Sequence, residues 1–492
     1  MENQLRELIG AELRRRHGYG MVEGKIKPVQ IANALMRWEY QGVGRTVELK
    51  SLLTATASKE SLETRIEAVK VMLERNRDRW GRLGEVDDIR RSTLMTRVLP
   101  LLRQILATDG AALGKSIEFS SFSSPTAMTV TRDISDDHAG EFIHTLWGSH
   151  DAAVRLDILD ILKEVTDPAK PLTEVDDLSA VLAPLAEEMV SVREVAWAAE
   201  DLGSRPLSPV EIRLRDAAAD LARYERALRP NPISSLQRVV LLAAISLFVH
   251  GATRSHEWSV APRRLLLVDA SATRTSAVAM TSERMVHRIL EDSRFYMADI
   301  LRGMFDGANI NWDRDPEATL RTVFEDRLKK ASPPRDLRPL YEALDDIRDG
   351  AAVIREELPK RLVELLDSAS GRSLDGFLRL LGLRCGLLYP QQKNMAKRVQ
   401  PMDRTLEVLV AGTLDVASER LEYRDFLDRF HDRWGMLVGG RPEDHGILAA
   451  AGHYVPNKEL TENSERFLAR LQALGLARRM ADSVAVVGRV EG

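Results

Sequence analysis

Cysteine is almost absent from this chain, which has Cys385 as its one thiol in 492 residues. A single cysteine excludes an internal disulfide and any zinc site that needs several thiolates from one chain. This usage fits a reducing compartment, so we expect a cytoplasmic protein. Aromatic residues are also scarce, at 5%. Leu, Ala and Arg dominate instead, which favours helices over sheets.

Long apolar runs and a strong positive charge are missing as well. The longest apolar run, 239–249, falls far short of the roughly 20 residues of a membrane span, so it predicts a buried core helix and no membrane partner. The net charge of −4 argues against a chain that coats nucleic acid, and any such contact must be a local patch. Because only 14 of the 70 basic residues are lysine, arginine clusters alone are weak signals.

Complete catalytic motifs are also absent from the sequence. It contains no nucleophile elbow, Rossmann fingerprint or paired Cys–His signal. We therefore expect a protein that is not an enzyme, although an enzyme whose site is assembled from distant residues stays open. No cofactor is expected, apart from a divalent cation at Asp269.

The length and the apolar periodicity predict a mainly α, multi-domain helical protein. Two exceptions interrupt the helical pattern: a small β element near 115–134, expected to be a hairpin or an exposed loop, and one buried strand near 263–268. Five divisions are predicted: an N-terminal helical domain (1–109), a β-leaning loop or hairpin (110–138), a central helical domain (139–388), a basic linker (389–404) and a terminal domain (405–492).

The predicted strand runs directly into Asp269, and Ser271 and Thr273 follow at alternate positions. A carboxylate at the C-terminal end of a strand faces the crevice where α/β proteins bind ligands, and these three side chains offer hard oxygen ligands for a divalent cation or a phosphate site. The spacing D-x-S-x-T resembles the metal-site loop of von Willebrand A domains and, more loosely, the first motif of haloacid-dehalogenase-type phosphatases. Both imply further parallel strands, whereas 280–400 has helical patterns. The alternative is that Asp269 or Ser271 caps the next helix or turn.

The last 90 residues have the order of elements of a winged helix. Two helices are predicted at 405–417 and 421–435, and a final apolar helix face ends at Gly475, where a helix C-cap is expected. A short hairpin around Ala481 and Asp482 follows. This order resembles winged-helix domains. Acids balance the bases of the last helix, so the candidate nucleic-acid contacts lie in the linker and the wing: Lys393, Lys397, Arg398, Arg478 and Arg479.

The segment 376–414 together with the terminal wing resembles large helical accessory subunits of bacterial anti-phage and DNA-processing systems. This resemblance implies a non-catalytic subunit with a C-terminal winged helix, whose partners are an ATPase or nuclease of the same system and DNA. Two alternatives stay open. One is a metal- or phosphate-binding enzyme or switch centred on Asp269, Ser271 and Thr273, and the other is a winged-helix transcriptional regulator.

Overall fold

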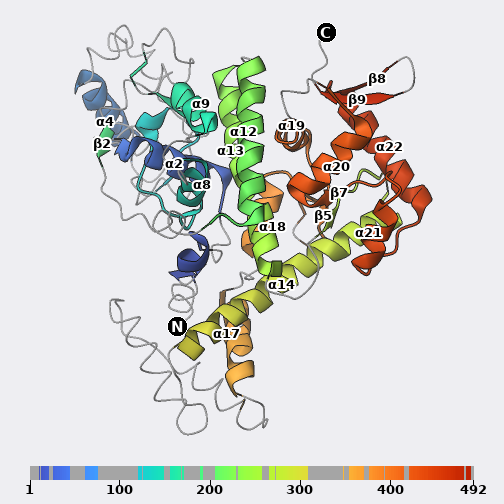
Figure 1. Ribbon diagram of the computed structural model, residues 1–492. Coiled ribbons are helices and arrows are strands. Elements are labelled where there is room, and N and C mark those ends of the chain that lie inside the picture. Colours follow the sequence, from blue (N-terminus) through green and yellow to red (C-terminus); the bar gives the residue numbers. More distant parts are fainter. Residues whose placement is uncertain are drawn as a thin grey trace. The chain divides into compact units, whose positions relative to one another are not determined.

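Helices dominate the protein, and its strands are few and short (Figure 1). The prediction of a mainly α protein is therefore confirmed. A computed structural model describes residues 10–11, 13–20, 26–44, 61–75, 120–124, 126–148, 156–167, 169–170, 189–191, 206–228, 231–257, 265–271, 273–307, 347, 354–370, 376–392, 394–414, 420–480 and 484–488.

The chain divides into two compact units. Unit 1 comprises Met1–Ile26, Trp197–Tyr224 and Ala244–Gly492, and unit 2 comprises Lys27–Ala196 and Glu225–Ala243. The segment boundaries expected from the sequence stay predictions. The described elements of unit 2 are α2 (Pro28–Tyr40), β1 (Gly42–Gly44), α4 (Leu62–Arg75), η4 (Ala127–Thr129), α8 (Ala139–Gly148), α9 (Asp157–Thr166) and β2 (Met189–Ser191).

Helices α2 and α8 form the centre of unit 2. They approach closely at Gly140, where a Cβ atom would lie 2.6 Å from the Ala34 side chain and 2.7 Å from the Ile31 carbonyl oxygen. The same region corrects the prediction of a hairpin or an exposed loop near 115–134 for residues 120–124 and 126–134, whereas 115–119 and 125 lie outside the described residues. Residues 130–134 belong to no strand. The Asn33 side-chain amide makes the two hydrogen bonds that a neighbouring strand would make with Thr131, because it accepts from the Thr131 N–H and donates to the Thr131 carbonyl. Most side chains of 120–124 and 126–133 are buried.

Unit 1 contains the C-terminal half of the chain. Its described elements are most of α12 (Pro209–Leu228), the later part of α13 (Pro232–Glu257), β3 (Leu266–Leu267), α14 (Ala277–Gly307), α17 (Ile354–Ser370), α18 (Gly376–Arg384), β4 (Leu388–Tyr389), β5 (Arg398–Val399), α19 (Asp403–Ala411), β6 (Arg420–Glu422), α20 (Tyr423–Trp434), β7 (Met436–Leu437), α21 (Asp444–Ala450), α22 (Asn457–Ala473), β8 (Ala477–Arg479) and β9 (Ala485–Gly488).

A buried hydrogen-bonded chain joins the three sequence segments of unit 1. The Tyr19 hydroxyl lies 2.8 Å from His250 Nδ1, and His250 Nε2 lies 3.4 Å from Glu211 Oε1. The other Glu211 oxygen accepts from the backbone N–H and the hydroxyl of Ser208, both at 2.7 Å. Tyr19, His250 and Glu211 are fully buried, so each polar group needs the partner that a distant segment supplies.

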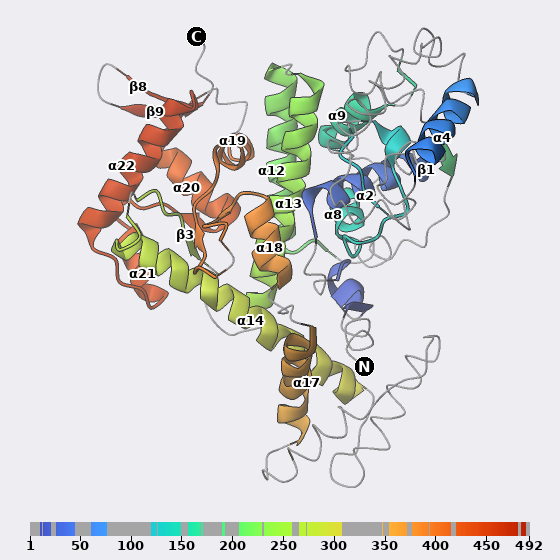
Figure 2. The same ribbon diagram turned by 180° about the vertical axis from the view of Figure 1, so that it is seen from behind.

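The predicted buried strand is confirmed as β3. Leu265–Val268 are all buried, and β3 pairs in parallel with β7. Val268 makes a parallel bridge to Val399 on its other side. One hydrophobic core joins this small sheet to α14, α21 and α22, through residues that include Leu267, Met285, Leu437, Leu448, Val455 and Leu460. Figure 2 shows α14 running from this region towards α17.

The C-terminal hairpin is also confirmed. β8 and β9 are antiparallel, and β6 adds to β9, which gives the strand order β6-β9-β8. α22 ends at Ala473, and Gly475 follows with a φ of +70°, as expected of a helix C-cap glycine. Within the predicted helix 421–435, which is α20, the residues Phe426, Phe430 and Trp434 recur at helix spacing and are buried.

One described helix, Pro232–Thr253, is long and apolar enough to cross a membrane by composition. The apolar window is 61% buried within the protein, and residues 239–249 contribute many of the buried side chains, among them Val239, Leu242, Ile245, Leu247 and Phe248. A core helix of a soluble protein meets the same criterion, so α13 is weak support for a membrane span.

Candidate functional site

The turn after β3 is built around the buried carboxylate of Asp269. Its Oδ1 accepts from the Ser271 N–H at 2.8 Å, which is the short-range bond of an Asx turn. The Ser271 hydroxyl donates to the Thr273 carbonyl at 2.9 Å. The N-terminal cap of α14 is formed by Ser276, the residue directly before the helix, because its Oγ accepts from the Ala279 N–H at 3.0 Å. Asp269 therefore caps the turn, and Ser276 caps the helix.

Arg398 of β5 neutralises this carboxylate. Its Nε lies 2.6 Å from Asp269 Oδ2, and the Arg398 and Asp269 side chains are 6% and 0% exposed. Arg398 NH1 also lies 3.8 Å from Glu283, and the guanidinium lies 5.5 Å from the centroid of the Tyr389 ring. A buried carboxylate requires such a counter-charge because desolvation of an unpaired ion is costly.

Asn463 and Glu459 connect α22 to the same turn. The Asn463 amide donates to the carbonyls of Val268 and Val438, each at 2.8 Å, and accepts from the Ala270 N–H at 2.8 Å. Glu459 Oε2 accepts from the Ala277 N–H at 2.6 Å, so a carboxylate satisfies an open donor at the start of α14. These buried and half-buried bonds fix α22 against β3 and α14.

This geometry gives two of the three predicted ligands, Asp269 and Ser271, structural roles. Asp269 is paired with Arg398, the Ser271 hydroxyl is bonded to a carbonyl, and Thr273 is exposed. Among the described residues, β3 pairs in parallel with β7, and Val268 makes one parallel bridge to Val399. This is smaller than the parallel sheet that the two resembled families imply. Within the described residues, no group of three His, Cys, Asp or Glu side chains is placed to hold a metal ion.

Two of the predicted nucleic-acid contacts are buried. Lys397 donates through Nζ to the Pro390 carbonyl at 2.9 Å and to the Gln392 carbonyl, and burial lowers the pKa of its ammonium group. Arg398 is paired with Asp269 as described above. The predicted linker thus forms the β4–β5 hairpin, with Lys397 and Arg398 facing inward. Lys393 lies outside the described residues.

The other two predicted contacts are accessible. Arg478 is half-buried and Arg479 is exposed on β8. Neither forms an ion pair with any residue that the structure describes. Successive strand side chains point to opposite faces, so the two guanidinium groups leave the hairpin on different sides.

The basic side chains of α22 are balanced by acids. Lys458 and Arg466 lie 3.9 Å and 4.0 Å from Glu462. Arg470 contacts Asp403 of α19 with Nε and NH2 at 3.1 Å and 2.6 Å. The net positive charge of this region therefore lies on the hairpin and not on the helix.

A surface that sequence inspection missed lies at the other end of α22. Tyr454 is 75% exposed, and the His445 ring meets its ring edge-on, with centroids 5.6 Å apart at 87°. Burial lowers the pKa of the neighbouring His453, and the charges of Arg288 and Arg284 lower that pKa further. No local pattern in the sequence signals this arrangement, because α14 and α21 are about 160 positions apart.

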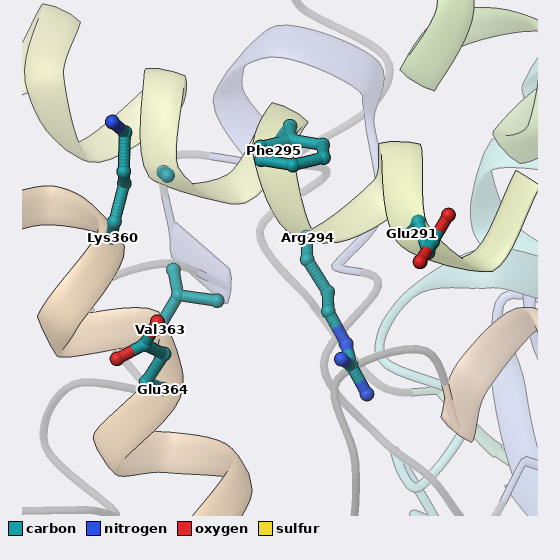
Figure 3. Close-up of a pocket in the computed structure, with 7 residues that line it drawn as sticks. Glu291, Arg294, Phe295, Lys360, Val363 and Glu364 are labelled. Atoms are coloured by element: carbon teal, nitrogen blue, oxygen red, sulfur yellow. The ribbon is translucent and has the colours of Figure 1, made fainter. Parts of the chain in front are cut away.

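A cavity of about 220 Å³ lies between α14 and α17 (Figure 3). Phe295, which is 57% exposed, contributes an apolar wall. Three of the four charged lining residues have ion-pair partners on their own helices: Glu291 with His287, Lys360 with Glu357, and Glu364 with Arg361. The cavity thus presents paired charges, which do not indicate a particular ligand.

No protein-family model matches the chain, and no curated protein matches it either. The inference of function therefore depends on the geometry of the described residues.

Proposed function

We propose that the C-terminal part of unit 1 is a winged-helix domain. The order of its elements supports this assignment: helix α19, strand β6, helices α20 and α22, and then the hairpin β8–β9, with the strands in the order β6-β9-β8. β7 and α21 are inserted before the last helix and join the hydrophobic core around β3. In this interpretation the β8–β9 hairpin is the wing.

The wing contacts nucleic-acid phosphates through Arg478 and Arg479. The observation that carries this proposal is the contrast in charge between the wing and α22. The two wing arginines have no acidic partner in the described residues, whereas the bases of α22 are paired with Glu462 and Asp403. Unpaired guanidinium groups on a hairpin suit phosphate contacts, which position a protein without sequence specificity.

The chain as a whole acts as a non-catalytic helical subunit of a nucleic-acid machine. The structural role of Asp269 supports this proposal, because the one sequence motif that suggested metal chemistry is used to fix β3, β5 and α14. Partner subunits, an ATPase or a nuclease, follow from the resemblance to bacterial anti-phage and DNA-processing subunits. α22, with its balanced charges, is the helix that we assign to a protein partner.

Direct binding to a labelled duplex at low salt tests the nucleic-acid function. The double variant Arg478→Ala, Arg479→Ala should weaken binding on the order of 10-fold, since two phosphate contacts are lost. Arg355→Ala, Arg361→Ala is the matched control, because it removes the same charge from exposed, paired positions of α17. Equal losses in both variants, or no binding by the unmodified chain, would contradict the proposal.

The same experiment separates this function from transcriptional regulation. A regulator binds its operator typically 10³–10⁷ times more tightly than other DNA. Wing-dominated binding should show little preference among duplex sequences. Recovery of one strongly preferred sequence from a random pool would therefore favour the regulator instead.

A further inference from the structure

The exposed ring of Tyr454 is held in place by the turn that carries it. Gly452 has a φ of +79°, a conformation that glycine adopts without strain. The His453 N–H donates to the Leu448 carbonyl at 2.9 Å, and the next residue, Val455, is fully buried. The His445 ring then packs against it in a perpendicular arrangement. Tyr454 is thus displayed to solvent from an ordered turn.

Two arginines of α14 lie beside this turn. Met285 packs in the same core as Leu448 and Val455, so the flanking exposed positions of α14 lie next to the turn. Arg284 and Arg288 occupy these positions, one helical turn apart, and neither forms an ion pair with a residue that the structure describes. Figures 1 and 2 both place α21 next to the N-terminal half of α14.

The neighbouring acids of α14 and α22 are engaged elsewhere. Glu283 lies near Arg274 and Arg398 at 3.5 Å and 3.8 Å. Glu291 pairs with His287 at 3.2 Å, and Glu459 accepts from the start of α14. Glu443 is the exposed acid near His445. The surface formed by Tyr454, His445, Arg284 and Arg288, here called the stacking platform, therefore combines an aromatic face with unpaired positive charge.

We propose that the stacking platform binds an unpaired nucleotide, with the base on Tyr454 and the flanking phosphates on Arg284 and Arg288. Aromatic faces and basic groups together form the usual binding surface for single strands. The inference rests on the proposed function, and it names the ligand as a duplex that continues into a single strand. The wing and the platform lie at opposite ends of α22, whose 17 residues span about 25 Å.

The test compares three labelled ligands on the full chain: a blunt duplex, the same duplex with a single-stranded extension, and the same extension without bases. Each is prepared with a DNA and with an RNA extension, which identifies the type of strand. The unmodified chain should prefer the base-containing extension over the blunt duplex by about 5- to 160-fold, the range for stacking of one base. The abasic extension should lose most of this preference.

Tyr454→Ala should remove the preference and leave blunt-duplex binding unchanged, while Tyr454→Phe should retain it. Phe295→Ala is the matched control, since it removes a different exposed ring, which lies on α14 away from the platform. A preference that survives Tyr454→Ala, or one that is equal for abasic extensions, would overturn the platform. The proposal would also be overturned if Tyr454→Ala weakened binding of a protein partner and left nucleic-acid binding unchanged.

The two proposals fail in different ways. If the blunt duplex does not bind but the extension binds through Tyr454, the proposed role of the wing is wrong and the proposed role of the platform is retained. If duplex binding depends on Arg478 and Arg479 but extensions do not increase the affinity, the proposed role of the platform is wrong and the proposed role of the wing is retained.

Discussion

Arg398 and Asp269 form a buried ion pair, with Arg398 Nε 2.6 Å from Asp269 Oδ2. Arg398 belongs to the β4–β5 hairpin, and Asp269 follows β3. The Asp269 N–H also donates to the Val399 carbonyl at 2.7 Å. The pair therefore fixes the hairpin to the strand end from which α14 begins, and the platform arginines lie on α14.

Breaking this pair should destabilise unit 1. Arg398→Ala leaves the Asp269 carboxylate buried without its counter-charge, which costs about 3–5 kcal/mol in comparable pairs. Calorimetric melting of the variant should show a lower transition temperature. The double variant Asp269→Leu, Arg398→Met should melt much closer to the unmodified chain, because it removes both charges and keeps apolar volume.

A cation site at Asp269 predicts a different pattern. Mg²⁺ or Ca²⁺ would then raise the melting temperature of the unmodified chain, and Asp269→Asn would abolish that increase. We expect no such increase, because Arg398 already neutralises the carboxylate. A clear stabilisation by either ion that depends on Asp269 would support the hypothesis of a metal site there.

Asp136 should make the stability of unit 2 depend on pH. Burial raises the pKa of its carboxyl group to about 6 from 3.8, so the folded state favours the protonated form. This contribution to stability is fully present below about pH 4 and is lost as pH rises through about 6. The loss is about 3 kcal/mol, at 1.4 kcal/mol for each pKa unit.

The variant Asp136→Asn should flatten this pH dependence and raise stability at neutral pH. Its amide oxygen can still accept from the Gly140 N–H, which lies 2.8 Å from the present carboxylate. Asp157→Asn, at an exposed acid in the first turn of α9, is the control. Identical melting profiles of the Asp136 variant and the unmodified chain between pH 4 and pH 7 would refute the prediction.

Cys385 should be unreactive while the protein is folded. Its thiol is buried, and burial raises its pKa to about 12, so almost no thiolate forms at pH 8. A thiol reagent should modify one group per chain in denaturant, since the sequence has one cysteine, and far less under native conditions. Rapid modification of the native protein would show that this part of unit 1 opens readily.

The sequence predicted the C-terminal elements well because their signals are local. The i, i+4 spacing of Phe426, Phe430 and Trp434 marks a buried helix face. Gly475 marks a helix end, and the alternating residues after it form the hairpin. Each signal lies within a few positions of the element that it describes, so no distant contact was needed.

The roles of Lys397 and Arg398 could not be predicted in this way. In the sequence they belong to a basic, proline-bounded segment, which is typical of an exposed linker. In the structure Arg398 is buried because Asp269, about 130 positions earlier, supplies the opposite charge. Two backbone carbonyls satisfy Lys397. Long-range pairs of this kind leave no local pattern.

The stacking platform illustrates the same limit. His445 and Tyr454 are nine positions apart, and their ring contact depends on the turn at Gly452. Arg284 and Arg288 come from another helix, and the core around Met285 and Val455 places them nearby. Residue type alone gave no reason to group these four side chains.

The dependence of duplex affinity on salt tests the central claim most directly. When the logarithm of the binding constant is plotted against the logarithm of the salt concentration, each phosphate contact makes the negative slope steeper by about 0.9. Arg478→Ala, Arg479→Ala should therefore reduce the slope by about 2, and the paired-charge control Arg355→Ala, Arg361→Ala should leave it unchanged. An unchanged slope in the wing variant, with the unmodified chain bound to duplex, would contradict the assignment of the wing as the phosphate contact.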